Sequence, residues 1–146
     1  MLAERPDLAS NAADEVLRFG GVVRSTVRVT TTDVDLAGVT IPTGTLVAPS
    51  FTAANRDPAH FVDAMTFDIT RPRERPHLGF GGGIHYCLGA SLARAELAEA
   101  FAVLSRRLTG LALDGEPSWR TPLGIQGPTC LPIRFDAGRA VVQRSR

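Results

Sequence analysis

The sequence predicts an α+β fold from three observations. Apolar residues recur at helical spacing in two segments, 12–19 and 93–108. Between them, residues 24–49 alternate apolar and polar side chains around turn signals, which is typical of short antiparallel strands. Residues 51–83 then lose any regular period and carry several prolines and aspartates. Such a long irregular segment is unusual inside a compact domain and indicates a functional loop.

The length and composition of the chain exclude several classes of protein. At 146 residues the chain is one domain, or one piece of a larger domain. With 44% hydrophobic residues and no apolar stretch long enough to span a bilayer, we expect a soluble, cytoplasmic protein with no membrane contact. Sixteen arginines against fifteen acids leave a net charge of +1. That balance argues against a nucleic-acid binder, because such binding rests on an excess of cations.

The first helix is expected over residues 12–19. Ser10 or Asn11 would serve as its N-cap, and Asp14 and Glu15 would then stand in the first turn, where the helix dipole favours anions. The glycine pair that follows would end the helix. Next, one small antiparallel sheet is expected over 24–49. Its strands and turns alternate along the chain: 27–31, Gly38, 39–41, 42–44 and 45–48.

A long second helix is expected because five apolar side chains recur at spacings of four, four, three and four: Ala93, Leu97, Phe101, Leu104 and Leu108. Gly110 would stop this helix. A last strand is expected at 131–135, followed by polar residues that fray. Cys130 has no flanking glycines and is expected to pack as a small apolar side chain.

The strongest chemical signal is the loop at 80–89, which reads Phe-Gly-x-Gly-x-His-x-Cys-x-Gly. A cysteine at a helix N-terminus faces unpaired N–H groups and the positive end of the dipole, which favours its thiolate. The glycines remove side chains and let a flat ligand approach the backbone. A thiolate in apolar surroundings is a good soft metal ligand. The alternative for any lone cysteine is an ordinary buried thiol.

This loop resembles the haem-binding signature of the cytochrome P-450 superfamily, including the Ala-Ser-Leu-Ala-Arg that follows it. Upstream, Glu15-x-x-Arg18 resembles the motif on the family's K helix, although alone it would be read as a surface ion pair of about 0–1 kcal/mol. Residues 39–45 and 54–58 resemble the family's strand turn and the segment leading into its meander. The resemblance extends from Asp7 to Phe135.

The resemblance implies the fold: the C-terminal part of the mainly-α cytochrome P-450 fold, with K helix, small antiparallel sheet, meander, cysteine loop, L helix and terminal strands. All of these would lie in a single segment, residues 1–146. The long central helix that manages dioxygen protonation, and most of the substrate pocket, would be absent. The chain would therefore be a fragment of a longer bacterial protein or a truncated gene product.

The resemblance also implies residue roles. Cys87 would be the catalytic residue and the metal ligand, an axial thiolate on the iron of haem b that favours O–O cleavage. The other expected cofactor contacts are Arg28, Phe80, Gly81, Gly83, His85 and Gly89. Among these, Arg28 and His85 would neutralise the propionates. Glu15 and Arg18 would support the loop, normally with a third arginine. Position 66 is a threonine, so Arg56 and Arg71 are the candidates for that role.

The implied activity is that of a monooxygenase, which inserts one atom of dioxygen into a small apolar molecule. Its electrons would come from a ferredoxin or flavodoxin-type donor, and the isolated chain is expected to be inactive. The alternative is a truncated, non-catalytic remnant that binds haem weakly or not at all. Arg71, Arg73 and Arg75 form a basic segment that is either a solvated loop or a docking surface for an acidic donor.

Overall fold

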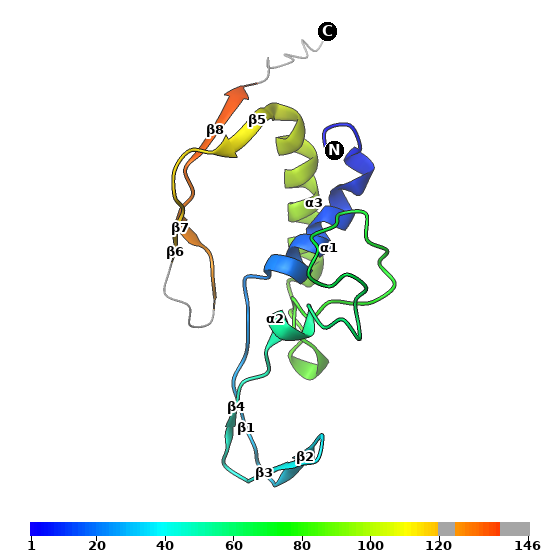
Figure 1. The fold of residues 1–146 in the computed structure, drawn as a ribbon, viewed down its shortest axis with the longest axis vertical. Coiled ribbons are helices and arrows are strands. Elements are labelled where there is room, and N and C mark those ends of the chain that lie inside the picture. Colours follow the sequence, from blue (N-terminus) through cyan, green and yellow to red (C-terminus); the bar gives the residue numbers. More distant parts are fainter. Residues whose placement is uncertain (120–124, 138–146) are drawn as a thin grey trace.

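The computed structural model describes residues 1–119 and 125–137. Two helices, α1 (Ala9–Gly20) and α3 (Ala90–Arg107), lie side by side at the centre of an elongated molecule (Figure 1). Two small strand ladders extend from one end, and two more lie along the flank of α3. The irregular segment folds over α1 on the side away from the second pair of ladders. The predicted mixture of helices and short antiparallel strands is confirmed.

Helix α1 begins three residues earlier than predicted. Pro6 starts a 3₁₀ turn, η1 (Pro6–Leu8), whose Pro6 carbonyl accepts the N–H of Ala9 and leads directly into the helix. The N-cap is therefore Leu8, without a side-chain cap, and the prediction of Ser10 or Asn11 at that position is wrong. The acidic pair at 14–15 consequently lies in the middle of the helix rather than in its first turn. The predicted end at the glycine pair is confirmed, with Gly21 as the C-cap.

Residues 24–49 form two antiparallel ladders instead of one sheet. β1 (Arg28–Val29) pairs with β4 (Leu46–Val47), and β2 (Val34–Leu36) pairs with β3 (Val39–Ile41). Gly38, with a φ of 82°, lies in the tight turn between β2 and β3, in a region that favours glycine. The side chains of both ladders are mostly exposed, so little burial connects one ladder to the other.

The segment 51–83 is irregular, as predicted, except for one short helix at its start. That helix, α2 (Phe51–Ala54), is capped by Ser50, whose Oγ accepts the N–H of Ala53 at 3.2 Å. A 3₁₀ turn, η2 (Gly83–His85), closes the segment just ahead of α3. The loop thus carries its own local structure at both ends.

Helix α3 ends at Arg107, and β5 (Leu108–Leu113) follows at once. The prediction that Gly110 stops the helix is wrong: it lies within β5 at a shift of strand register, with a φ of 62°. β5 pairs with β8 (Ile133–Ala137), and β6 (Ser118–Trp119) pairs with β7 (Pro128–Cys130). Cys130 is exposed in β7, contrary to the prediction that it packs. The predicted frayed tail at 138–146 lies outside the described residues.

Among the described residues, the buried core is small and lies where α1 meets α3 and the irregular segment. It consists of short side chains with one aromatic and one leucine: Ala9, Ala12, Ala13, Leu17, Phe61, Ala64 and Ala90. Three polar residues are buried with them: Glu15, Arg18 and Asn55. No described helix is long and apolar enough to cross a bilayer.

Candidate functional site

The cysteine loop, residues 80–89, is folded back on itself. The N–H of Cys87 donates to the carbonyl of Phe80 at 3.0 Å, which closes the loop. Gly81 and Gly83 have φ values of 73° and 65°, in the left-handed region that other residues rarely adopt. Gly89 is the N-cap of α3, so the cysteine stands two residues before the N-cap and three before the first helical residue, Ala90. The sequence therefore places the thiol at the positive end of the α3 dipole.

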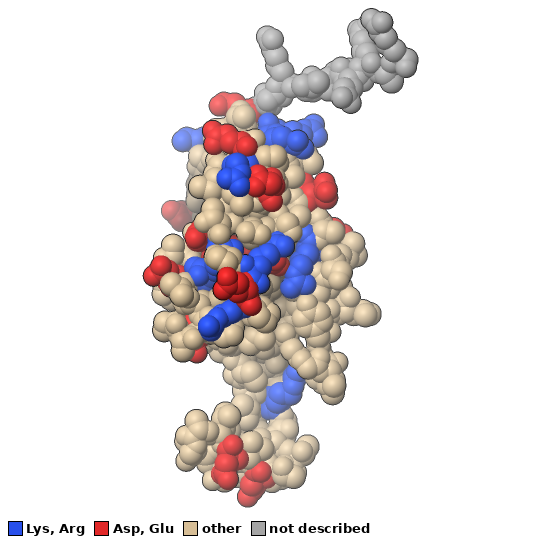
Figure 2. Space-filling model, turned by 90° about the vertical axis from the view of Figure 1, so that its right-hand side faces the viewer, with Lys and Arg blue, Asp and Glu red and all other residues tan. Residues whose placement is uncertain are grey.

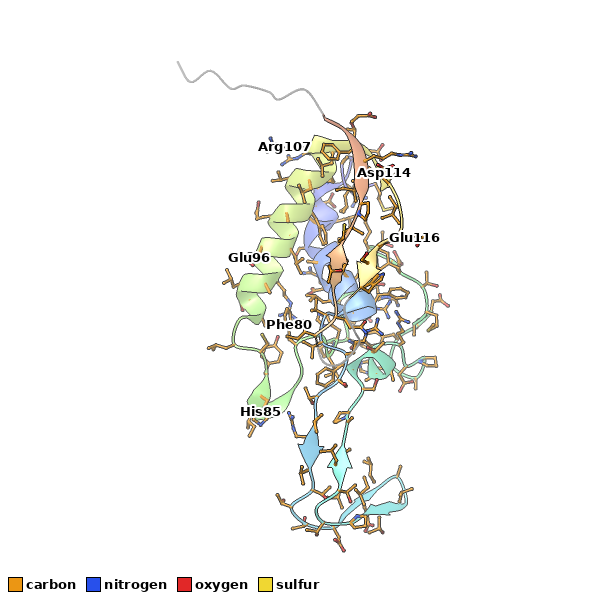
Figure 3. The ribbon with its side chains drawn as sticks, turned by 90° about the vertical axis from the view of Figure 1, so that its left-hand side faces the viewer. Phe80, His85, Glu96, Arg107, Asp114 and Glu116 are labelled. Carbon is orange, nitrogen blue, oxygen red and sulfur yellow. The ribbon has the colours of Figure 1, made fainter. Side chains whose placement is uncertain are left out.

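The loop forms one wall of a mostly apolar hollow of about 750 Å³ that is open on one side. Its size falls in the range of about 300–1,000 Å³ that is typical of small-molecule and cofactor sites. Five of the predicted contact residues line it: Arg28, Phe80, Gly81, His85 and Cys87. Figure 3 shows Phe80 near the N-terminal end of α3 and His85 at the outer tip of the loop. The other two predicted contacts, Gly83 and Gly89, belong to the loop but do not line the hollow.

The remaining walls of the hollow come from elements far apart in the sequence. Leu17 of α1, Phe51 of α2 and Leu97 of α3 contribute apolar side chains. Arg28 contributes a guanidinium to this hollow, and its Nη1 donates to the neighbouring Val27 carbonyl at 2.8 Å. An apolar hollow with a cation and a histidine can take a flat apolar ligand that carries carboxylates.

The donor set also fits a metal held inside a flat cofactor. Among the described residues, no group of three or more His, Cys, Asp or Glu side chains could hold a metal ion by itself. A metal at Cys87 would therefore need its other ligands from a cofactor. A Cβ built on Gly83 meets no atom within 4 Å, and one on Gly81 first meets Phe51 at 3.8 Å. A side chain at Gly83 would therefore meet open space and one at Gly81 an ordinary van der Waals contact, and Cys87 itself is exposed rather than shielded from water.

Behind the loop, Glu15 and Arg18 form a buried, two-pronged ion pair. Arg18 donates from Nε to Oε2 at 2.8 Å and from Nη2 to Oε1 at 2.7 Å, and the two side chains are 3% and 4% exposed. This burial excludes the alternative of a surface ion pair. Arg18 also donates to three backbone carbonyls, those of Asn55, Ala64 and Thr66, at 2.8–2.9 Å. One guanidinium thus fastens the irregular segment to α1.

Arg71 is the arginine that joins this pair, with its Nε 3.3 Å from Oε2 of Glu15. The other candidate, Arg56, turns away: its Nη2 donates to the carbonyl of Phe19, and its guanidinium lies 4.3 Å from that ring centre. Burial raises the pKa of Glu15, but hydrogen bonds from Arg18 and the Asp68 N–H and the charges of both arginines outweigh it. The net effect lowers the pKa of Glu15, so its carboxylate stays ionised.

Two supporting residues, Asn55 and Gly79, were not predicted from the sequence. Asn55 is buried, and its Oδ1 accepts the N–H of Leu78 at 2.6 Å, two residues before the cysteine loop. Gly79 lies so close to α1 that a Cβ there would stand 2.8 Å from the carbonyl oxygen of Leu17. Asn55 stood within a segment, 54–58, that already resembled the family, which was the available signal. Gly79 had no such signal, because its contact is created only by folding.

The basic segment is not a row of free charges. Arg71 is paired with Glu15, and Arg73 places its Nε 3.1 Å from Asp14 and donates from Nη2 to Ser10 at 2.6 Å. Arg75 is exposed and makes one long contact, to the carbonyl of Ala59 at 3.5 Å. On this face of the molecule, positive and negative side chains are interspersed (Figure 2). The two alternatives for this segment, solvated loop or docking surface, therefore apply to Arg75 and not to the whole segment.

The family profile described as Cytochrome P450 matches residues 5–116. Luteothin monooxygenase of Streptomyces thioluteus is 49% identical over 137 residues, which are 93% of this chain and 34% of that protein. Mycinamicin IV hydroxylase/epoxidase of Micromonospora griseorubida is 43% identical over 137 residues, covering 90% of this chain and 34% of that protein. The chain spans about a third of the length of these curated relatives.

This chain is also similar to a solved structure. P450BioI, in complex with an acyl carrier protein ligated with hexadec-9Z-enoic acid, matches with a TM-score of 0.87 at 43% identity. The match covers 92% of this chain and 35% of that one. Helices, ladders and cysteine loop thus take the arrangement of the C-terminal part of that fold. Because the family profile covers most of the sequence and the backbone follows a solved member, the chain belongs to the cytochrome P450 family.

Proposed function

We propose that residues 1–146 are the haem-binding C-terminal part of a bacterial P450 monooxygenase that oxidises a small apolar molecule. The observation that carries the proposal is the hollow, in which Cys87, Phe80, Gly81, His85 and Arg28 face one apolar space. The relatives named as a monooxygenase and as a hydroxylase/epoxidase support the same chemistry. They do not identify the substrate, so only the class is proposed.

Each side chain would act through its position. The Cys87 thiolate would bind the iron of haem b just before the N-terminal end of α3. Arg28 and His85 would pair with the carboxylates of the cofactor, and Phe80 would cover one apolar edge. Gly81 would let the flat ring system approach the backbone. When bound, haem supplies the activation of dioxygen and the transfer of one oxygen atom to the substrate.

Glu15, Arg18 and Arg71 would hold this loop from behind without touching the cofactor. Their hydrogen bonds reach the segment before the loop at Ala64 and Thr66. Electrons would come from a ferredoxin or flavodoxin-type donor in the cytoplasm. Arg75 is the exposed cation of the basic segment that could attract an acidic donor, which would raise the rate of association more than the affinity.

A chimaera tests the proposal directly. Residues 1–146 would replace the matching third of luteothin monooxygenase, which is 49% identical to them, and the chimaera would be assayed for oxidation of luteothin. We expect haem incorporation and product formation dependent on an electron donor. A matched chimaera with Cys87→Ala should give neither. A soluble, folded chimaera that takes up haem without thiolate ligation would contradict the proposed role.

The second candidate function is a non-catalytic remnant, and the open side of the hollow favours it. A cofactor in this hollow would remain uncovered on the open side, and large apolar side chains are exposed there, such as Val22, which lines the hollow, and Leu88, which follows Cys87 in the sequence. Such surfaces promote association instead of tight ligand binding. Titration of the 146-residue chain with haem distinguishes the two. Weak or no binding by the chain alone, with activity in the chimaera, would assign the chain as one part of an enzyme.

A further inference from the structure

Asp14 is the meeting point of three elements of the fold. From its place on α1, its Oδ1 accepts a hydrogen bond from Nε of Arg94 on α3 at 2.8 Å. Its Oδ2 lies 3.1 Å from Nε of Arg73 in the irregular segment. Nε2 of His77, in the same segment, lies 3.5 Å from Oδ1. One carboxylate therefore faces three basic side chains, and none of these contacts belongs to the Glu15 network.

Two of those basic side chains, Arg94 and His77, also contact the cysteine loop. The guanidinium of Arg94 lies 4.8 Å from the ring centre of Phe80, and its Nη1 donates to the hydroxyl of Tyr86 at 3.1 Å. The His77 ring lies 5.9 Å from the Phe80 ring. Phe80 in turn accepts the N–H of Cys87 at 3.0 Å through its carbonyl. A continuous set of contacts thus runs from Asp14 to the backbone of Cys87.

The geometry of His77 shows which proton faces Asp14. Its Nδ1 accepts the N–H of Gly79 at 2.9 Å, so the proton of the neutral ring is on Nε2, the atom directed at the carboxylate. The side chain is 7% exposed, and Nε2 has no hydrogen-bond partner closer than this carboxylate in the described part of the chain. A buried N–H in this state gains from a nearby negative charge.

We propose that Asp14 is a positioning residue for the cysteine loop: through Arg94 and His77 it holds Phe80, and through Phe80 it holds the backbone of Cys87. That this position serves haem ligation rests on the proposed function. The ordering of the loop itself does not rest on it. Asp14 is thus separate in role from Glu15, which fastens the irregular segment through Arg18 and Arg71.

Amide hydrogen exchange tests the proposal in the full chain. In Asp14→Asn, the Cys87 N–H should exchange about tenfold faster, because the group that accepts it is less firmly held. Amides in the middle of α3 should be unchanged. Asp7→Asn is the matched control, since Asp7 is an exposed carboxylate paired only with Arg5 among its described contacts. Arg94→Gln should reproduce the effect, and the double variant should add little beyond either single change.

Several outcomes would overturn the proposal. These are equal acceleration at all amides, no acceleration at Cys87, or fully additive effects of the two variants. If Asp14→Asn does not fold, Arg94→Gln alone decides. The haem-loaded protein gives a second readout: Asp14→Asn should show a smaller fraction of the red-shifted Soret band in its reduced carbon monoxide complex. If the chimaera that carries the wild-type residues 1–146 takes up no haem, the proposed function fails, whereas the exchange result still decides the role of Asp14.

Discussion

Arg71 and Glu15 are 56 positions apart in the sequence, yet Nε of Arg71 lies 3.3 Å from Oε2 of Glu15. Arg71 also donates to the backbone carbonyls of Val62, Asp63 and Thr66. Arg71 therefore fastens the irregular segment onto α1 together with Arg18, which donates to the same Thr66 carbonyl. The threonine at position 66 contributes its carbonyl to this arrangement instead of a third guanidinium.

Arg71→Ala should destabilise the protein by about 2–3 kcal/mol, because it removes hydrogen bonds from a charged group and leaves several acceptors without a donor. The free energy of unfolding in urea measures the loss. Arg75→Ala is the control: the side chain is exposed, so its removal should change stability by less than about 0.5 kcal/mol. Equal losses of unfolding free energy in both variants would contradict the claim that the contacts of Arg71 stabilise the fold.

Gly79→Ala should destabilise by about 1–3 kcal/mol, since the new methyl group would collide with α1. Its Cβ would lie 2.8 Å from the Leu17 carbonyl oxygen and 2.9 Å from Nδ1 of His77. Gly82→Ala is the comparison, because the nearest described atom to a Cβ there is Leu78 Cδ2, at an ordinary 3.9 Å. Thermal unfolding of both variants checks the difference. A Gly82 variant that is as unstable as the Gly79 variant would contradict this explanation.

Mild acidification should lower the stability of the folded protein, because the buried side chain of His77 resists taking up a proton. Burial lowers the pKa of His77 below the ordinary value of about 6.5, although the negative charge of Asp14 opposes the shift. The unfolded chain therefore takes up this proton at a higher pH than the folded chain. Stability is complete above about pH 6.5 and is lost as the pH falls toward the lower folded value.

Urea unfolding of the wild type and of His77→Asn at pH 7.5 and pH 5.5 measures this contribution. The asparagine oxygen can still accept the N–H of Gly79, but the side chain does not titrate. The wild type should lose more stability between the two pH values than the variant does. The exposed His60 and His85 are present in both proteins and cancel in the comparison. An equal loss would show that His77 is not the group responsible.

Arg75→Glu should slow the second-order rate of reduction by an acidic ferredoxin without changing the haem spectrum. The effect should shrink with salt, because the Debye length falls from about 10 Å at 0.1 M to about 3 Å at 1 M. Arg73→Glu is less suitable for this test than its neighbour, since it would place a second carboxylate beside Asp14. Stopped-flow reduction at two ionic strengths gives the answer. An unchanged rate of reduction at low salt would show that Arg75 does not take part in docking the donor.

The elements predicted most closely were those with a local cause. The strand at 39–41 and the end of α1 at its glycine pair follow from turn chemistry within a few residues. The start of α1 was wrong because Pro6 begins a 3₁₀ turn, which periodicity does not reveal. Gly110 was wrong because a glycine at a strand irregularity and one at a helix end look alike in sequence.

In the candidate site, too, features with a local cause were predicted from the sequence, whereas long-range contacts were not. Of the six loop residues expected to contact a ligand, Phe80, Gly81, His85 and Cys87 line the hollow, whereas Gly83 and Gly89 do not. The partners of Glu15 and Asp14 could not be assigned, since Arg71 and Arg94 approach α1 only after the chain has folded. Sequence alone left Arg56 and Arg71 equal, whereas the contact of Arg56 with Phe19 separates them.

The most direct test of the central claim is the absorption spectrum of the reduced carbon monoxide complex, recorded for the haem-loaded protein that carries this chain. The wild type and Cys130→Ala, whose cysteine is exposed on β7 away from the loop, should both show the red-shifted Soret band of thiolate ligation. Cys87→Ala should lose that band. Its retention in Cys87→Ala, or its absence from the wild type, would contradict the assignment of Cys87 as the haem ligand.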